Sequence, residues 1–291
     1  MKELQSVMSA IPPARRRLVG TALRRYRENV GYDLADAARV LGCDRSKISR
    51  IESGERGIRA PELHALLTEY GVDFPAQEAL GGLSQPATRR CWWQDHAGVV
   101  LEGMKDFAAI EALASSICVY DAHRVPELLQ TPGYAKALVD AGETDDEARD
   151  QMLAAVLARQ QAVFASRPEI ALVIAEAALL NVVGGPKVTR DQLTELARVS
   201  SDSGHVTIHV LPLTRGTQVA ATGPMTIVGI SGVPSLGAVH VPGVRGGICL
   251  TDAADVAACA RAFEQLKVYA LPSAQSARLL RELPGRRALH R

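Results

Sequence analysis

Residues 33–54 read Asp33-Leu-Ala-Asp-Ala-Ala-Arg-Val-Leu-Gly-Cys-Asp-Arg-Ser-Lys-Ile-Ser-Arg-Ile-Glu-Ser-Gly54, and this stretch decides the fold of the first part of the chain. Asp33 and Asp44 are each placed to cap a short helix, because an aspartate there can accept hydrogen bonds from free backbone N–H groups. Gly42 lies between the two helices and permits a tight backbone turn. The stretch therefore predicts two short helices joined in a helix-turn-helix arrangement.

The two predicted helices differ in what they expose. Leu34, Ala37, Ala38 and Leu41 share one face of the first helix and are expected to be buried. On the second helix Ile48 and Ile51 face the same small core, while the opposite side is short, polar and cationic. Such a surface suits a helix that lies in the major groove of DNA, where arginine can bond guanine edges and small serines permit close approach. The residues predicted to read bases are Arg45, Ser46, Ser49 and Arg50.

This stretch resembles the lambda-repressor/Cro-like (XRE-type) helix-turn-helix domains of bacterial regulators. Their pattern Gly-x-Ser/Thr-x-x-x-Ile-Ser-x-Ile-Glu-x-Gly corresponds here to residues 42–54. The resemblance implies that Glu52 pairs with Arg27, late in the preceding long helix, and that this pair stabilises the domain without touching DNA. Leu34 stands where the family often has a phosphate-binding glutamine. The alternative to the whole interpretation is an ordinary two-helix hairpin with a charged, solvated face.

Charge is distributed unevenly along the chain. Residues 1–90 hold 15 Lys and Arg against 11 Asp and Glu, whereas residues 91–291 hold 18 against 21. A basic first part on a mildly acidic second part orients the first part toward phosphates. For the arginines of the first long helix, a solvated basic face is the alternative. The residues predicted to contact phosphates are Arg16, Lys47, Arg56 and Arg59.

The chain has 291 residues, which is too long for a helix-turn-helix domain alone, so two domains are expected. We expect an N-terminal all-α domain of about five helices followed by a C-terminal α+β domain with a mainly antiparallel sheet. Short strands separated by Gly and Pro turns late in the chain favour antiparallel pairing. The predicted boundaries are a flexible arm at 1–13, the helix-turn-helix domain at 14–83, a linker at 84–90, the α+β domain at 91–283 and a tail at 284–291.

A second resemblance covers nearly all of the chain after the predicted linker. The stretch Val125-Pro-Glu-Leu-Leu-Gln-Thr-Pro-Gly-Tyr-Ala135 resembles a block in the C-terminal domain of WhiJ-like actinobacterial regulators. The Trp92-Trp93 pair and the motifs at 159–160, 176–179, 210–212 and 270–276 occur in that family's order. The resemblance implies a transcriptional regulator, often encoded beside a small partner protein. It supplies no defined ligand and no catalytic residue.

Several polar and aromatic residues of the large domain are candidates for contacting a ligand or partner. The adjacent tryptophans are interpreted first as a packing anchor, because aromatic residues are rare here and bury much area. Arg159 and Glu176 are charged residues in otherwise apolar surroundings. They indicate either a structural ion pair, which is favoured, or a polar group in a pocket. Glu102, Asp106 and Glu111 are interpreted as a solvated helix face. The candidates are Trp92, Trp93, Tyr120, Gln130, Tyr134, Arg159 and Glu176.

The sequence predicts neither a cofactor nor a catalytic site. His205 and His209 share one face of a predicted strand, and His240 lies on a later predicted strand, but a third ligand at a fixed spacing is missing. The glycines at 243–247 lead into a strand rather than a helix, so a β-turn is favoured over a phosphate site. No G-x-S-x-G or H-E-x-x-H motif occurs. We therefore expect no metal and no enzyme activity.

Cysteine usage and hydropathy bear on location. The five cysteines include no C-x-x-C motif, which favours a reduced compartment. No signal peptide and no membrane-spanning segment is predicted. The expected location is cytoplasmic, in association with the nucleoid.

Together these patterns predict a sequence-specific DNA-binding transcriptional regulator. It should bind double-stranded DNA as a homodimer, because one helix-turn-helix buries too little DNA surface for high specificity. The large domain is expected to sense a small ligand or to bind a small protein. The alternative is an antitoxin-like or anti-repressor-controlled interaction protein in a two-gene module, and an enzyme tethered to DNA is a third hypothesis.

Overall fold

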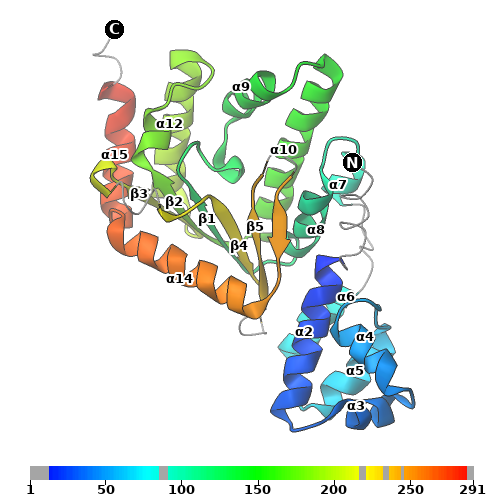
Figure 1. Ribbon diagram of the computed structural model, residues 1–291. Helices are drawn as coiled ribbons and strands as arrows, with labels where there is room; N and C mark the ends of the chain where they lie inside the picture. Colours follow the sequence, from blue (N-terminus) through cyan, green and yellow to red (C-terminus); the bar gives the residue numbers. More distant parts are fainter. Residues whose placement is uncertain (1–12, 85–90, 216–220, 232–235, 244–245, 287–291) are drawn as a thin grey trace.

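The computed structural model describes residues 13–84, 91–215, 221–231, 236–243 and 246–286 (Figure 1). Residues 1–12 of the predicted arm, 85–90 of the predicted linker and 287–291 of the predicted tail lie outside the described residues. The first part of the predicted tail is helical, since α15 (Ser273–Arg286) continues to residue 286.

Residues 14–84 form a helical region, as the sequence predicts. Its described part contains five helices, of which α3 and α4 are the predicted helix-turn-helix pair. The apolar side chains of the five helices are buried in one hydrophobic cluster, which includes Leu18, Ile48, Ile51, Leu66 and Leu80. The helices are α2 (Ala14–Asn29), α3 (Leu34–Leu41), α4 (Arg45–Glu52), α5 (Ala60–Glu69) and α6 (Phe74–Ser84).

The helix-turn-helix forms for the reasons that its sequence suggests, with one difference. Asp33 accepts hydrogen bonds from the N–H groups of Ala35 and Asp36, and Asp36 accepts one from Asp33, which completes a capping box. Gly42 adopts the left-handed conformation with φ of 57° at the end of α3. Asp44 occupies the N-cap position of α4, but the predicted side-chain cap is wrong: the Lys47 N–H bonds the Asp44 carbonyl oxygen instead.

Close backbone contact fixes the position of α4 against α2. A Cβ atom at Gly20, in the middle of α2, would lie 2.5 Å from the carbonyl oxygens of Ile51 and Glu52. Only a residue without a side chain permits this approach. The end of α4 therefore rests directly on the backbone of α2.

The large domain is built on a mixed sheet of six strands in the described residues, in the order β3-β2-β1-β4-β5-β6. Three of the five strand pairings are antiparallel, and the β1–β2 and β2–β3 pairings are parallel. The parallel half arises because helices connect these strands, as parallel pairing requires. The strands are β1 (Ser116–Asp121), β2 (Glu169–Ala175), β3 (Val206–Leu211), β4 (Met225–Gly229), β5 (Gly237–Val241) and β6 (Ile248–Leu250).

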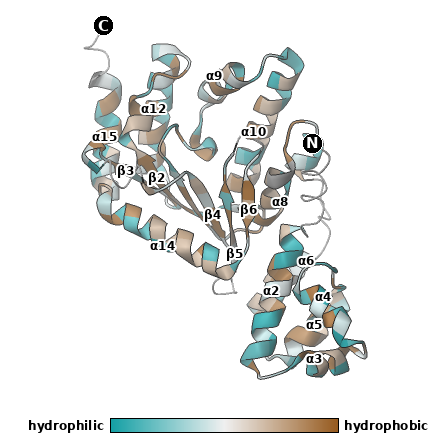
Figure 2. Cartoon of the chain, in the orientation of Figure 1, coloured by the Kyte–Doolittle hydropathy of each residue, from teal (hydrophilic) through white to brown (hydrophobic). Residues whose placement is uncertain are grey.

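Helices cover both faces of this sheet (Figure 1). On one face, Phe263 and Leu266 of α14 pack against Tyr120, Val173 and Val239. On the other face, α8 packs against β5 and β6, and α12 and α15 pack against β3 and against each other. Figure 2 shows the hydrophobic residues gathered on the strands. The further elements are α7 (Trp92–Asp95), α8 (Glu102–Glu111), η1 (Glu127–Leu129), α9 (Pro132–Gly142), α10 (Asp146–Ser166), α11 (Glu176–Leu180), α12 (Gly185–Asp202), η2 (Leu213–Arg215) and α14 (Ala253–Tyr269).

The start of α2 joins the helical region to the large domain. The Ala14 N–H donates to Asp106 of α8 at 2.9 Å. Arg17 donates from Nε to the Thr251 hydroxyl and from Nη2 to the Cys249 carbonyl oxygen, both at 3.0 Å. The helix that supports α4 is therefore also held by α8, by β6 and by the residue that follows β6. Among the described helices, none has the length and apolar character needed to cross a bilayer.

We expect Gly20→Ala to lower the free energy of unfolding by about 1 to 3 kcal/mol, because the new methyl group meets backbone that cannot move aside. Gly81→Ala in α6 is the matched control, since a Cβ there meets nothing within 4 Å. Removing a helical glycine at that position should raise stability by roughly 0.5 to 1 kcal/mol. Urea unfolding followed by circular dichroism measures both. Equal stability of the two variants would contradict the close contact between α2 and α4.

Candidate functional site

The predicted base-reading residues form an exposed strip on α4. Arg45, Ser46, Ser49 and Arg50 are all exposed, while Ile48 and Ile51 on the opposite side are buried. The Arg50 Nε atom lies 3.6 Å from Glu55, and both side chains are more than half exposed. A pair so open to water contributes little, so Arg50 can leave it at low cost.

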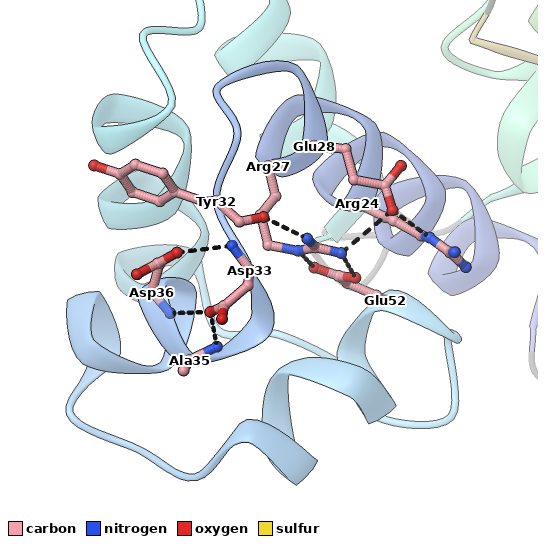
Figure 3. A network of polar contacts seen from close by, with 8 residues as sticks. All are labelled: Arg24, Arg27, Glu28, Tyr32, Asp33, Ala35, Asp36 and Glu52. Atoms are coloured by element: carbon pink, nitrogen blue, oxygen red, sulfur yellow. Dashed lines mark hydrogen bonds and ion pairs between the residues drawn. The ribbon is translucent and has the colours of Figure 1, made fainter.

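A buried ion pair holds α4 in place beneath this strip. Arg27 donates from Nε to Oε1 of Glu52 at 2.7 Å and from Nη2 to Oε2 at 2.9 Å. Its Nη1 atom donates to the carbonyl oxygen of Tyr32 at 2.7 Å. Figure 3 shows the pair between the end of α2 and the end of α4. The structure thus contains the Arg27–Glu52 contact that the resemblance implies, away from the exposed strip.

The predicted phosphate-binding cations lie in two different environments. Arg16 and Arg56 are exposed. Lys47 and Arg59 both donate to Oε1 of Glu62, at 2.7 and 2.9 Å. These bonds, first from Arg59 and then from Lys47, lower the pKa of Glu62 to about 2. Sequence reasoning did not single out Glu62, which keeps two of the four cations bound to the protein itself.

The large domain contains a cavity of about 390 Å³ between the sheet and the helices α7, α9 and α10. Four of the seven residues predicted to contact a ligand or partner line it: Trp92, Tyr120, Gln130 and Arg159. The apolar part of its wall is formed by Val99, Val100, Leu101, Met104, Val119, Leu138, Val139, Met152, Ala155 and Val156. The polar part includes Asp121, Arg124, Glu127, Thr226 and His240.

Arg159 is the centre of a buried charged cluster at this wall. It donates from Nε and Nη2 to both oxygens of Glu111, at 2.9 and 2.7 Å, and from Nη1 to Glu127. Arg159 is 6% exposed and Glu111 is 1% exposed. The interpretation of Glu111 as part of a solvated face is therefore wrong. A usable signal was its spacing, because Glu111 follows the buried Phe107 by four residues and so shares its helix face.

The block at 125–135 forms another part of the wall and is held by side-chain amides. Gln160 of α10 donates to the carbonyl oxygens of Glu127 and Gln130, at 2.6 and 2.9 Å. Gln192 of α12 donates to the Leu129 carbonyl oxygen at 2.7 Å. Gln130 itself donates to the Val125 carbonyl oxygen at 2.8 Å. These bonds explain why a segment with little regular structure keeps a fixed shape.

His240 of β5 also lines the cavity, and sequence reasoning connected it only with a metal. Its Nε2 atom lies 2.7 Å from the Gly246 carbonyl oxygen, and its ring lies 5.2 Å from that of Phe107. Burial lowers the pKa of His240, so the ring is neutral near pH 7. The Gly246 N–H bonds the Gly243 carbonyl oxygen, as a turn requires, while residues 244–245 lie outside the described residues.

The other candidates from the sequence lie elsewhere or serve packing. Trp93 is buried in a cluster with Val100 and Ala155, and the Tyr134 hydroxyl accepts a hydrogen bond from the Val125 N–H. Glu176 accepts one from the Leu213 N–H at 2.9 Å. Tyr120 borders the cavity but packs with the cluster beneath α14.

No group of three His, Cys, Asp or Glu side chains that could hold a metal occurs within the described part of the chain. His209 lies 3.1 Å from the Leu271 carbonyl oxygen through Nδ1, and His205 lies 3.3 Å from the Ser203 hydroxyl. Each of these two histidines thus contacts a neighbouring polar group of the fold.

Comparison with known protein families gives two matches. A helix-turn-helix domain matches residues 18–80, and a domain of unknown function (DUF5753) matches residues 104–282. The first match identifies residues 18–80 as a helix-turn-helix DNA-binding domain. No curated protein and no solved structure matches the chain.

Replacing Glu52 by Gln should lower the free energy of unfolding by about 3 kcal/mol, because it removes the buried carboxylate that is bonded to the buried charge of Arg27. Glu28→Gln is the control within the same network: Glu28 bonds Arg24 at 2.9 Å and lies 3.5 Å from Arg27, and its side chain is 53% exposed. Its loss should cost at most about 1 kcal/mol. Both values come from chemical unfolding of the full chain. A Glu52 variant as stable as the Glu28 variant would show that the buried pair does not stabilise the domain.

Proposed function

The chain belongs to the family of the domain of unknown function DUF5753 and carries a helix-turn-helix DNA-binding domain before it, and we propose that it is a transcriptional regulator of the XRE type. In this proposal it is similar to WhiJ-like regulators and acts on DNA in the cytoplasm. The observation that carries this proposal is the exposed strip of Arg45, Ser46, Ser49 and Arg50 on a helix held rigidly from below. In this proposal the protein is not an enzyme, and its cavity binds a small regulatory ligand.

The proposed DNA contacts follow from the chemistry of the strip. With α4 in the major groove, Arg45 and Arg50 can each make two hydrogen bonds to a guanine edge, and the serines allow close approach. Arg16 and Arg56 are exposed cations suited to phosphates at the sides of the groove. Lys47 and Arg59 would exchange their bonds with Glu62 for phosphate bonds.

A homodimer is part of the proposal because α4 presents only two turns of helix to DNA. Regulators with one such helix per chain reach specificity by placing two of them in successive major grooves, about 34 to 36 Å apart. The operator should accordingly be a palindrome or near-palindrome.

Two structural connections between the cavity wall and α2 support ligand control of DNA binding. Helix α8 contributes Met104 and the bonded Glu111 to the cavity region, and its Asp106 accepts the hydrogen bond from Ala14. The β5–β6 segment contributes His240 to the wall, and Thr251, directly after β6, bonds Arg17 of α2. A ligand that moves either element would move α2, and couplings of this kind typically amount to about 1 to 3 kcal/mol.

Selection of bound sequences from a random DNA library by the full chain tests the proposal. We expect enrichment of a near-palindrome with half-sites about one helical turn apart. The absence of any enriched sequence would overturn it. Purification from the native host distinguishes the alternative control mechanism: a small protein that copurifies and releases the DNA would replace the ligand as the regulator.

Replacing Arg50 by Ala should weaken binding to the selected sequence by about 1 to 3 kcal/mol and relax base choice at one position in each half-site. The same variant should bind unrelated DNA almost as well as the original protein. Fluorescence anisotropy with both DNA molecules measures this difference. Equal loss on both would mean that Arg50 contacts phosphate rather than a base.

Arg16→Ala should instead weaken binding to every sequence and reduce the dependence on salt. Loss of one phosphate contact lowers the slope of log K against log salt by about 0.9. Arg278→Ala is the control, because Arg278 is exposed on α15 in the large domain. A slope that stays the same in the Arg16 variant would remove Arg16 from the proposed interface.

A further inference from the structure

We infer that the cavity beside Arg159 binds an organic cation, namely a protonated amine that carries an apolar body. The inference rests on the proposed function, in which this cavity is the ligand site, and it adds the chemical class of the ligand. It follows from three features: a surplus of carboxylate charge around Arg159, acceptor atoms on Glu127, Gln130 and His240, and apolar sides that include a tryptophan.

The charges at the wall do not balance. Asp121, Glu127 and Glu111, which is bonded to Arg159, supply three carboxylates, whereas Arg124 and Arg159 supply two guanidinium groups. Arg124 lies 3.4 Å from Asp121, which leaves Arg159 between two glutamates. Both oxygens of Glu111 are bonded to Arg159, so the surplus negative charge falls on Glu127. A positive ligand group would neutralise it, and an anionic ligand would be repelled.

Glu127 is placed to meet such a group. Its side chain is 34% exposed, in contrast to the enclosed Glu111. Oε2 accepts from Arg159, while Oε1 has no hydrogen-bond donor among the described residues. The η1 backbone that carries Glu127 is fixed by Gln160, so the carboxylate is held ready before a ligand arrives. An ammonium group can donate to the remaining oxygen in a charge-assisted hydrogen bond.

The neighbouring polar groups also leave acceptors for the ligand. The Gln130 amide N–H is used by the Val125 carbonyl oxygen, which leaves its own Oε1 atom. A carbonyl oxygen can only accept, so the His240 Nε2 atom carries the proton that it shares with Gly246. In the neutral ring Nδ1 is then an acceptor. These two acceptor atoms and the remaining Glu127 oxygen suit an ammonium group, which offers only donors.

The apolar part of the wall calls for an apolar body on the same ligand. Trp92, Met104, Leu138, Met152 and Val156 surround the space. A tryptophan ring attracts cations through its negative face, and methionines adapt to irregular shapes. The volume of about 390 Å³ is at the lower end of the range of roughly 300 to 1,000 Å³ for small-molecule sites.

Three probes of nearly equal shape and different charge test the inference on the full chain: 2-phenylethylammonium, 2-phenylethanol and phenylacetate. Binding at pH 7 is followed by ligand-observed NMR. We expect the ammonium ion to bind about tenfold more tightly than the alcohol, as one charge-assisted hydrogen bond allows. Phenylacetate should bind most weakly. Val156→Trp, which fills the cavity, should abolish binding of all three probes.

Glu127→Gln then tests the residue that is proposed to contact the cation. It should remove most of the preference for the ammonium ion over the alcohol while the affinity for the alcohol stays nearly the same. Glu195→Gln on α12, outside the cavity, should leave all three affinities unchanged. Asp121→Asn serves as a second variant if the Glu127 variant unfolds, and it should reduce the same preference.

The outcomes separate this inference from the proposed function. Equal or tighter binding of phenylacetate would overturn the ligand class and leave the cavity as a ligand site. The inference would also be overturned if the preference for the ammonium ion survived in both carboxylate variants. Binding that survives in Val156→Trp, or a lack of binding by all three probes, would overturn it as well. None of these results affects the DNA selection, whose failure alone would overturn the regulator.

Discussion

The bond between Arg27 and Glu52 is the constraint on which the orientation of α4 depends. Helix α4 has only eight residues, and isolated helices of that length are not stable in water. Its position must therefore be imposed by its neighbours. The bidentate Arg27–Glu52 pair fixes the last residue of α4 to α2, and the contact at Gly20 fixes the distance between the two backbones. The exposed strip can be polar throughout because stability is supplied from the buried side.

The large domain repeats this use of a buried arginine for another purpose. Arg159 is held by two glutamates from different elements, α8 and η1, so it connects two walls of the cavity. Breaking such a buried pair is costly, which makes the relative position of the walls well defined. Because α8 also contacts the first residue of α2, the cavity and the DNA-binding helices share one rigid element.

Local patterns predicted the helical region well. The Asp33 cap, Gly42 and the spacing of Ile48 and Ile51 each act within a few residues, so the sequence alone is sufficient there. The exception is Asp44, which holds the N-cap position of α4 without a side-chain hydrogen bond. The sheet was predicted as mainly antiparallel, and the short late strands do pair so. Its parallel half depends on which distant strands come together, and no local pattern contains that information.

The cavity could be predicted only in part. Trp92 and Arg159 stood out by residue type, but their partners come from distant segments. The charge of Glu111 favours a solvated face, but its spacing of four residues from the buried Phe107 places it on the buried one. Glu176, a candidate for contacting a ligand or partner, instead accepts a backbone hydrogen bond near β3. Pairing across 48 residues, as for Glu111 and Arg159, requires the fold.

Glu62 has a consequence for how the protein would search a chromosome. By holding Lys47 and Arg59, it competes with every phosphate that the proposed interface meets. Ordinary DNA offers phosphates only, whereas a correct site adds base contacts that outweigh the competition. Because phosphates are the same in every sequence, an internal acidic competitor of this kind shortens the residence time on all DNA by a similar factor. The protein would then sacrifice some overall attraction to DNA in exchange for faster sampling of sites.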